Sequence, residues 1–86
     1  MSDLKSDFDA ALAASRTITT KPDNSTLLEL YSLFKQATVG DVQGKRPGML
    51  DLKGRAKFDA WTARKGVTKD AAMQQYVALV GRLLAS

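Results

Sequence analysis

Two short runs of the sequence place cationic and aromatic side chains four residues apart. Tyr31 and Lys35 form the first pair, and Lys53, Lys57 and Trp61 continue the same spacing in the second run. Residues four apart lie on the same side of a helix, so each run presents an aromatic ring beside an ammonium group. If Lys35 and Lys57 converge on one point, they can neutralise a phosphate while a ring offers its face to a base. The spacing therefore predicts a nucleotide site.

The same residue types also have ordinary structural roles. A lysine on a helix is usually solvated, and we assign no further role to five of them: Lys5, Lys21, Lys45, Lys65 and Lys69. Phe58 and Trp61 suit a core, and we favour the core for Trp61. Tyr31 and Tyr76 are equally compatible with core rings whose hydroxyl groups reach the surface. Periodicity alone does not decide between these roles.

The positive charge is concentrated in the middle of the chain. The whole chain has 13 Lys and Arg and 9 Asp and Glu, which gives a net charge of +4. Residues 35–69 contain nine of the cations and three of the acids, so this region carries +6 and the remainder −2. Such a concentration attracts an anionic partner, which can be a nucleotide, a nucleic acid or a lipid headgroup.

Two residue types that chemistry often needs are missing, because the chain has no cysteine and no histidine. Disulfides and thiolate metal sites are excluded, which favours a reduced, intracellular setting. The commonest general base and most zinc or iron sites are excluded as well. We therefore expect no metal, no cofactor and no catalysis. No apolar run approaches the roughly 18–20 residues of a membrane span, and the N-terminus lacks a signal-peptide pattern, so we expect a cytoplasmic chain that starts near Met1.

The elements that position these side chains are helices. Apolar residues repeat at helical spacing in four places, and no alternation of period two persists, so we predict an all-α fold. Eighty-six residues allow one domain, and we expect residues 1–86 to form it. The first helix carries apolar positions from Leu4 to Leu12, is capped by Ser2 or Asp3, and ends before Ile18.

Local signals place the other three helices. Lys21-Pro22 precedes a cluster of capping residues at 23–26, where the second helix starts, and Gly40 ends it in the left-handed conformation. A loop at 41–51 follows, with a turn at Pro47-Gly48. The third helix covers residues 53–64, and Gly66 is the residue expected to stop it. Thr68 caps the fourth, whose apolar stripe contains Met73, Tyr76, Val77, Val80, Leu83 and Leu84.

A long contiguous stretch carries a more specific signal. Residues 31–61 read YSLFKQATVGDVQGKRPGMLDLKGRAKFDAW and resemble the acyl-CoA-binding protein family, also called diazepam-binding inhibitor. Two blocks, KQATVGD from residue 35 and RPGMLDLKG from residue 46, occur in the family's order and separation. The resemblance extends to Phe8, Lys21-Pro22 and Tyr76, so it covers almost the whole chain.

The resemblance implies a four-helix up-down-down-up bundle that binds long-chain acyl-CoA one to one without reacting with it. By position, it implies that Tyr31, Lys35 and Lys57 hold the 3′-phosphorylated adenosine and that the Phe34 ring stacks on the adenine. Further contact positions implied in the same way are Arg16, Lys53 and Tyr76.

Three positions depart from the commonest family pattern. Arg16 stands where relatives commonly have lysine, so the charge is retained on a planar group. Phe34 replaces a frequent tyrosine and lacks its hydroxyl, and Phe58 replaces a usual tryptophan. None of these changes removes a phosphate ligand, so we expect affinity or chain-length preference to change rather than acyl-CoA binding itself.

The predicted function is non-catalytic binding and intracellular carriage or buffering of medium- to long-chain acyl-CoA by a monomer. Its partners are the acyl-CoA ligand and, transiently, acyl-CoA-using enzymes or membrane surfaces. Leu28, Met49 and Leu50 are candidates for lining the acyl tail, from their apolarity and, for the last two, their loop position.

The alternative is a small basic helical nucleic-acid-binding domain, since the central charge and helical content also suit duplex phosphates. Its weakness is that acids interleave with the cations at Asp41, Asp51 and Asp59. We therefore expect no nucleic-acid partner. A protein-interaction module or a secreted peptide precursor has no distinctive feature in this sequence.

Overall fold

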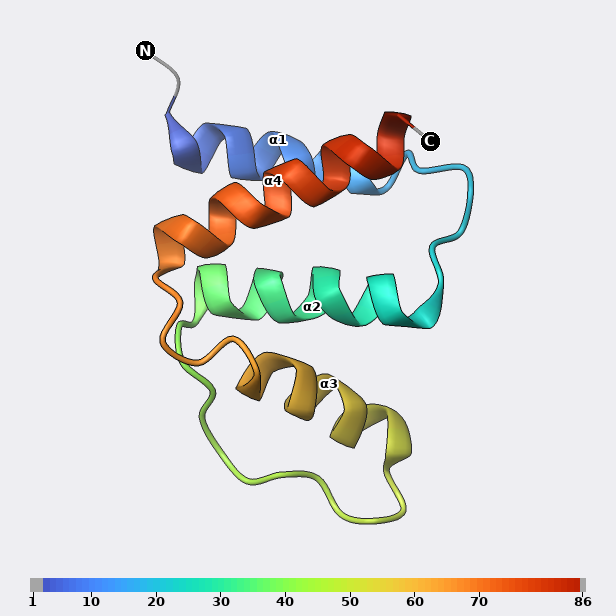
Figure 1. Cartoon of the computed structure of the whole chain (residues 1–86), viewed down its shortest axis with the longest axis vertical. Coiled ribbons are helices and arrows are strands. Elements are labelled where there is room, and N and C mark those ends of the chain that lie inside the picture. Colours follow the sequence, from blue (N-terminus) through green and yellow to red (C-terminus); the bar gives the residue numbers. More distant parts are fainter. Residues whose placement is uncertain (1–2, 86) are drawn as a thin grey trace.

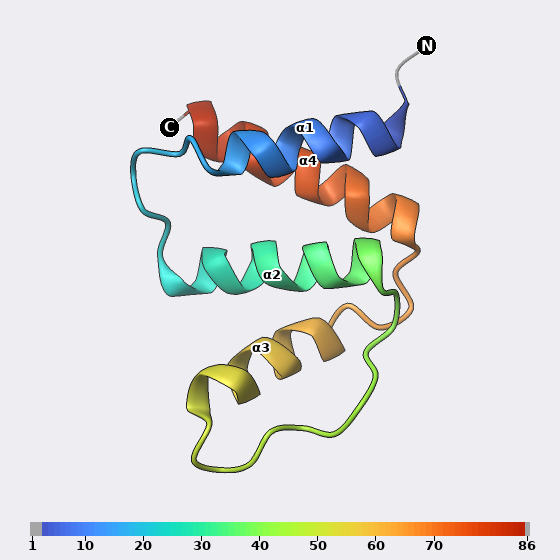
Figure 2. The same cartoon turned by 180° about the vertical axis from the view of Figure 1, so that it is seen from behind.

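The computed structural model describes residues 3–85 and contains four helices: α1 (Leu4–Ser15), α2 (Asn24–Thr38), α3 (Leu52–Thr62) and α4 (Lys69–Ala85). No strand occurs within this described range. Helices α1 and α4 run in one direction and α2 and α3 in the other (Figure 1), and the view from behind agrees (Figure 2). The predicted all-α, up-down-down-up bundle is thus confirmed. Between residues 3 and 85, no helix is both long and apolar enough to span a membrane.

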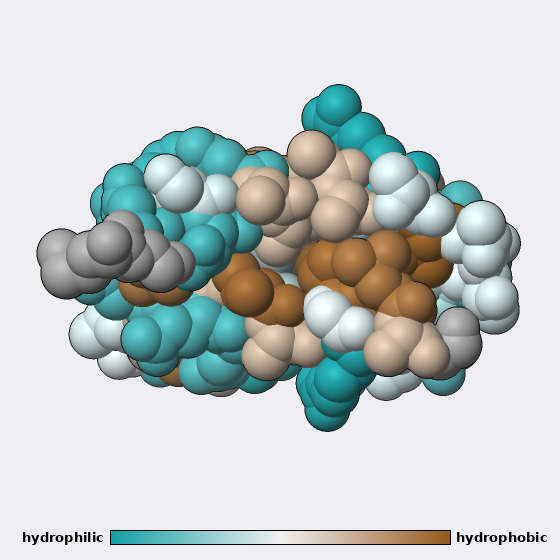
Figure 3. All heavy atoms as spheres, turned by 90° about the horizontal axis from the view of Figure 1, so that it is seen from above, coloured by the Kyte–Doolittle hydropathy of each residue, from teal (hydrophilic) through white to brown (hydrophobic). Residues whose placement is uncertain are grey.

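The helices pack in the spatial order α1, α4, α2, α3. Helix α4 contacts both α1 and α2, and α2 also contacts α3. The molecule measures 43 × 28 × 15 Å. Helix α3 and the segment 41–51 form one end of the longest axis, and α1 and α4 form the other (Figure 1). A view onto the α1 and α4 end shows apolar side chains gathered along the line between the two helices (Figure 3).

The hydrophobic core lies where α1, α2 and α4 meet. Its buried members are Phe8, Ala11, Leu33, Ala37, Ala72, Tyr76, Leu79 and Val80. The predicted stripes on α1 and α4 contribute Phe8, Ala11, Tyr76 and Val80, whereas Leu84 of the same stripe is exposed. Helix α2 is covered by α4 on one side and by α3 on the other. It therefore buries Ser32, Leu33 and Gln36 as well as Ala37, and these residues do not form a single apolar face.

Capping side chains start the helices where local signals predict them. Asp3 and Asp23 accept hydrogen bonds from backbone N–H groups two and three residues further on, at 3.1 and 2.8 Å. Thr68 accepts one from the third residue after it, at 3.0 Å. Such caps satisfy N–H groups that the helix itself leaves free. The other predicted cap of the first helix, Ser2, lies outside the described residues.

Helix ends follow the glycine signals only in part. Gly40 has φ +96°, the left-handed conformation predicted for the end of α2. The predicted third helix at 53–64 was wrong at its end: α3 covers Leu52–Thr62, and turns lead from it to Gly66, which has φ +92°. The glycine therefore redirects the chain after the helix instead of terminating the helix.

The loop at 41–51 is attached to α3. The predicted turn at Pro47-Gly48 is placed two residues later, since the N–H of Asp51 donates to the carbonyl of Gly48 at 3.0 Å. Asp51 also caps α3, so the turn closes on the residue that starts the helix. Arg46 Nε and Nη2 donate to the two carboxylate oxygens of Asp59 at 2.9 and 2.7 Å. These hydrogen bonds lower the pKa of Asp59 below its ordinary value.

Candidate functional site

The contact between α2 and α3 brings together the four-residue pairs that the sequence singled out. Lys57 Nζ lies 5.4 Å from the centroid of the Tyr31 ring, and Lys35 Nζ lies 5.0 Å from the Trp61 ring. Because the two helices are parallel, a step of four residues on α2 is matched by a step of four on α3. Each helix thus supplies one cation and one ring, and each cation faces the ring of the other helix.

This α2–α3 seam, made by Tyr31, Lys35, Lys57 and Trp61, places two ammonium groups on adjacent turns. One step of four residues corresponds to about 6 Å along a helix axis. Lys35 is half-buried and Lys57 is exposed. Within residues 3–85, no salt bridge joins either ammonium group to an acid. The seam therefore carries two positive charges with aromatic faces beside them, an arrangement that attracts a phosphate attached to a base.

Trp61 holds the end of this seam in place. Its side chain is only 7% exposed, and Nε1 donates to the carbonyl of Gly40 at 2.8 Å. This carbonyl belongs to the residue that follows the last turn of α2, so the indole fastens α3 to the end of α2. The role favoured from the sequence, a core tryptophan, is confirmed, although Trp61 lies outside the main core cluster.

The ring expected to stack on the adenine, Phe34, is joined to the core by aromatic contacts. Phe34 is half-buried, and its ring stacks on Phe8 with centroids 6.4 Å apart. Phe8 in turn meets Tyr76 edge to face at 5.2 Å. Tyr76 is only 5% exposed, so most of its ring is a core component. These three rings come from three different helices and pack together at the core.

The two remaining predicted cations differ in position. Lys53 is exposed on α3 and lies one turn before Lys57, so it extends the positive charge along the same helix face. Arg16 is the exposed C-cap of α1, a helix whose backbone lies beside that of α4 and not beside α2 or α3. The structure therefore groups Lys53 with the seam and leaves Arg16 apart from it.

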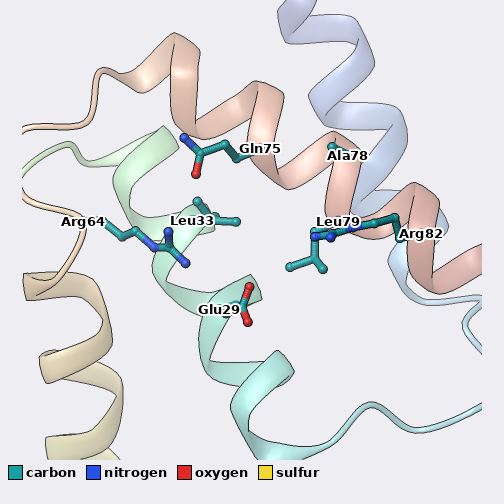
Figure 4. Close-up of a pocket in the computed structure, with 7 residues that line it drawn as sticks. All are labelled: Glu29, Leu33, Arg64, Gln75, Ala78, Leu79 and Arg82. Atoms are coloured by element: carbon teal, nitrogen blue, oxygen red, sulfur yellow. The ribbon is translucent and has the colours of Figure 1, made fainter.

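Hollows in the surface lie away from the two seam lysines. A groove of about 400 Å³ lies between α2, α4 and the turn that follows α3 (Figure 4), lined by Glu29, Leu33, Arg64, Gln75, Ala78, Leu79 and Arg82. Another of about 390 Å³, between α2 and α3, includes Leu28, one of the predicted tail contacts. No group of three His, Cys, Asp or Glu residues within the described range could hold a metal ion.

Comparison with known proteins identifies the family. Residues 5–80 match the family model described as Acyl CoA binding protein. The chain belongs to the acyl-CoA-binding protein family. Two similar relatives are acyl-CoA-binding protein homolog 1 of Caenorhabditis elegans, 55% identical over 78 residues (91% of each chain), and the homolog of Manduca sexta, 49% identical over 84 residues (96% of this chain and 93% of that one).

Solved structures of the acyl-CoA-binding protein family have the same fold. The crystal structure of acyl-CoA-binding protein 2 from Oryza sativa superposes with a TM-score of 0.93 at 41% identity, over 96% of this chain and 92% of that one. The solution structure from yeast gives a TM-score of 0.72 at 44% identity, over 91% of each chain. The family resemblance inferred from residues 31–61 is confirmed.

Sequence reasoning missed a polar cluster that joins the loops on either side of α3. Gln36 is fully buried, and its Nε2 donates to Asp41 Oδ1 at 2.9 Å and to the carbonyl of Val67 at 2.7 Å. Asp41 Oδ1 also accepts the N–H of Gly66 at 2.9 Å. The hydrogen bonds from Gly66 and Gln36 lower the pKa of Asp41. A glutamine next to a site lysine was the only signal in the sequence, and it does not reveal partners 31 residues away.

Proposed function

We propose that this protein binds medium- to long-chain acyl-CoA thioesters at the α2–α3 seam and carries them without changing them. It acts as one acyl-CoA-binding domain over residues 1–86, as a cytoplasmic monomer. Membership of the family supports the ligand class. The observation that carries the location of the site is the pair of ammonium groups on adjacent turns of parallel helices, with no acid paired to them within the described residues.

The seam suits the phosphorylated adenosine end of the ligand. A terminal phosphate monoester brings about −1.5 to −2 charges, which Lys35 and Lys57 offset from two helices. The Tyr31 hydroxyl is a candidate hydrogen-bond donor to a phosphate oxygen. A phosphate placed between the two lysines replaces some cation–π attraction by stronger charge-assisted hydrogen bonds. Binding therefore draws α2 and α3 onto the same group.

The other contacts are proposed from family position. Phe34 supplies a stacking face for the adenine, with its remaining surface packed on Phe8. Tyr76 contributes through its hydroxyl edge, since its ring is buried. Lys53 adds charge on the same face of α3, and Arg16 reaches the ligand from the end of α1.

The affinity for acyl-CoA should increase with the length of the acyl tail, because burial of the tail is favourable. Each methylene removed from water contributes roughly 0.8 kcal/mol, so a few covered methylenes exceed any single ion pair. Leu28 lines the groove between α2 and α3, and Met49 and Leu50 lie at the exposed turn before α3. We propose these three side chains as tail contacts. Carriage then ends in transient contact with acyl-CoA-using enzymes or membrane surfaces, and the protein catalyses no reaction of the thioester.

Calorimetric titration with a series of acyl-CoA lengths, beside free CoA and free fatty acid, tests this proposal. We expect affinity to rise with chain length, free CoA to bind measurably more weakly, and free fatty acid to bind least. Equal affinity for all lengths, or release of CoA during the titration, would contradict it. The nucleic-acid alternative makes the opposite prediction, namely duplex binding that falls steeply with salt and ignores acyl chains.

A further inference from the structure

Three large apolar side chains stand almost entirely in solvent at one corner of the molecule. Leu50 is fully exposed, and Met49 and Leu52 are 77% and 74% exposed. Among residues 3–85, the next most exposed large apolar residue, Leu84, is 46% exposed. A single exposed leucine is ordinary, but three such side chains within four residues mark an interaction surface. We call Met49, Leu50 and Leu52 the tip.

The segment that bears the tip lies where a flat partner can reach it. The loop at 41–51 and α3 form one end of the longest axis, far from α1 and α4 (Figures 1 and 2). The loop is also linked to α3, because Arg46 Nε and Nη2 donate hydrogen bonds to the two carboxylate oxygens of Asp59. The apolar side chains are therefore presented on an anchored turn.

Cations lie close to the tip along the sequence. Residues 42–59 contain two acids and five cations, so they carry +3 of the chain's net charge of +4. The five cations are Lys45, Arg46, Lys53, Arg55 and Lys57. Arg46 is neutralised by Asp59, whereas Lys45 and Lys53 make no salt bridge within the described residues. Exposed apolar side chains flanked in the sequence by cations complement one surface above others, a bilayer whose anionic headgroups cover acyl chains.

We propose that the tip inserts into the interface of an anionic phospholipid bilayer, with the neighbouring lysines on the headgroup phosphates. This inference rests on the proposed carrier function. It names the surface through which the carrier contacts a membrane. Because the tip comprises the turn before α3 and the first residue of α3, the docked protein holds the α2–α3 seam near the bilayer. A bound acyl tail then has a short path between protein and membrane.

A single fluorescent label tests the insertion directly. The chain has no cysteine, so Leu52→Cys gives one site for an environment-sensitive fluorophore. Leu84→Cys, at the end of α4, is the matched control. Without acyl-CoA, we expect the label at 52 to brighten and shift to the blue with vesicles containing phosphatidylserine. The label at 84 should not change. An equal response of both labels, no response at 52, or an equal response to pure phosphatidylcholine would overturn the proposal.

Binding of unlabelled variants to the same vesicles gives a second measurement. We expect Leu52→Ala to lower the vesicle partition coefficient about tenfold, and Leu84→Ala to leave it within about twofold. Lys45→Gln should lower it about fivefold at low salt and less at high salt. Equal effects of Leu52→Ala and Leu84→Ala would contradict the assignment of the tip.

Titration with free CoA separates this inference from the proposed function. Leu52→Ala and Lys45→Gln should bind free CoA normally. If the unmodified protein binds acyl-CoA but no phosphatidylserine vesicles, the membrane inference is wrong and the carrier function stands. If it binds vesicles through the tip but no acyl-CoA, the carrier function is wrong.

Discussion

Removing the positive charge of the α2–α3 seam should weaken binding of the CoA head group and leave the fold intact. Lys35→Met and Lys57→Met are suitable changes, because methionine keeps an apolar stem over the Trp61 and Tyr31 rings while the ammonium is lost. Lys21→Met, at an exposed lysine before α2, is the matched control.

The size of the expected effect follows from the surroundings of each lysine. A hydrogen bond to a charged group contributes about 1.5–3 kcal/mol, which corresponds to roughly 10- to 150-fold in Kd. Lys35 is half-buried, where electrostatic interactions are less screened, so it should lie near the upper limit. Lys57 is exposed and should lie near the lower limit. Because both act on one phosphate, the double variant should lose less than the sum of the two losses.

Titration with free CoA and with 3′-dephospho-CoA measures these losses. Both variants should bind CoA more weakly, and most of their deficit should disappear with dephospho-CoA, which lacks the group they hold. Lys21→Met should match the unmodified protein with both ligands. Urea unfolding of each variant checks that stability changes little. If the ratio of the affinities for CoA and 3′-dephospho-CoA is the same in both variants as in the unmodified protein, the seam is not the phosphate site.

Two further predictions concern stability. Gly81→Ala should raise the free energy of unfolding by about 0.5–1 kcal/mol, because an added Cβ meets nothing within 4 Å. Gly54→Ala should lack this gain, since its Cβ would displace the Asp51 carboxylate that caps α3, a loss of about 1 kcal/mol; equal urea midpoints for the two variants would refute this. Asp41 has a lowered pKa, so its stabilisation is present above its unfolded-state pKa and is lost as pH falls through the folded-state pKa. The difference in unfolding free energy between the unmodified protein and Asp41→Asn should therefore be smaller below about pH 4 than at neutral pH. A difference that stays the same at both pH values would contradict the assigned hydrogen bonds.

Features that depend only on residues close together in the sequence were predictable from the sequence. The caps at Asp23 and Thr68 and the left-handed Gly40 each require only a few residues of backbone. The buried face of α2 was not predictable in this way. It meets α4 and α3 on different sides, so its buried residues, including Leu33 and Gln36, do not follow one apolar stripe.

The candidate site shows the same division between local and distant information. Spacing within each helix predicted the pairs Tyr31–Lys35 and Lys57–Trp61. It did not contain the register between helices, which sets Lys57 over Tyr31 and Lys35 over Trp61. That register depends on the parallel direction of α2 and α3, which only the family resemblance implied.

Helix α3 has a single helical neighbour, since within residues 3–85 it packs against α2 and no other helix. Helix α1 also has one helical neighbour in this range, but it buries Phe8 and Ala11, whereas the buried side chain of α3 is Trp61. We therefore expect α3 and its preceding loop to open at a low free energy. A CoA head group that binds to both α2 and α3 disfavours this local unfolding. Loaded and empty forms of the protein should therefore differ in how often α3 unfolds locally, even where their average shapes agree.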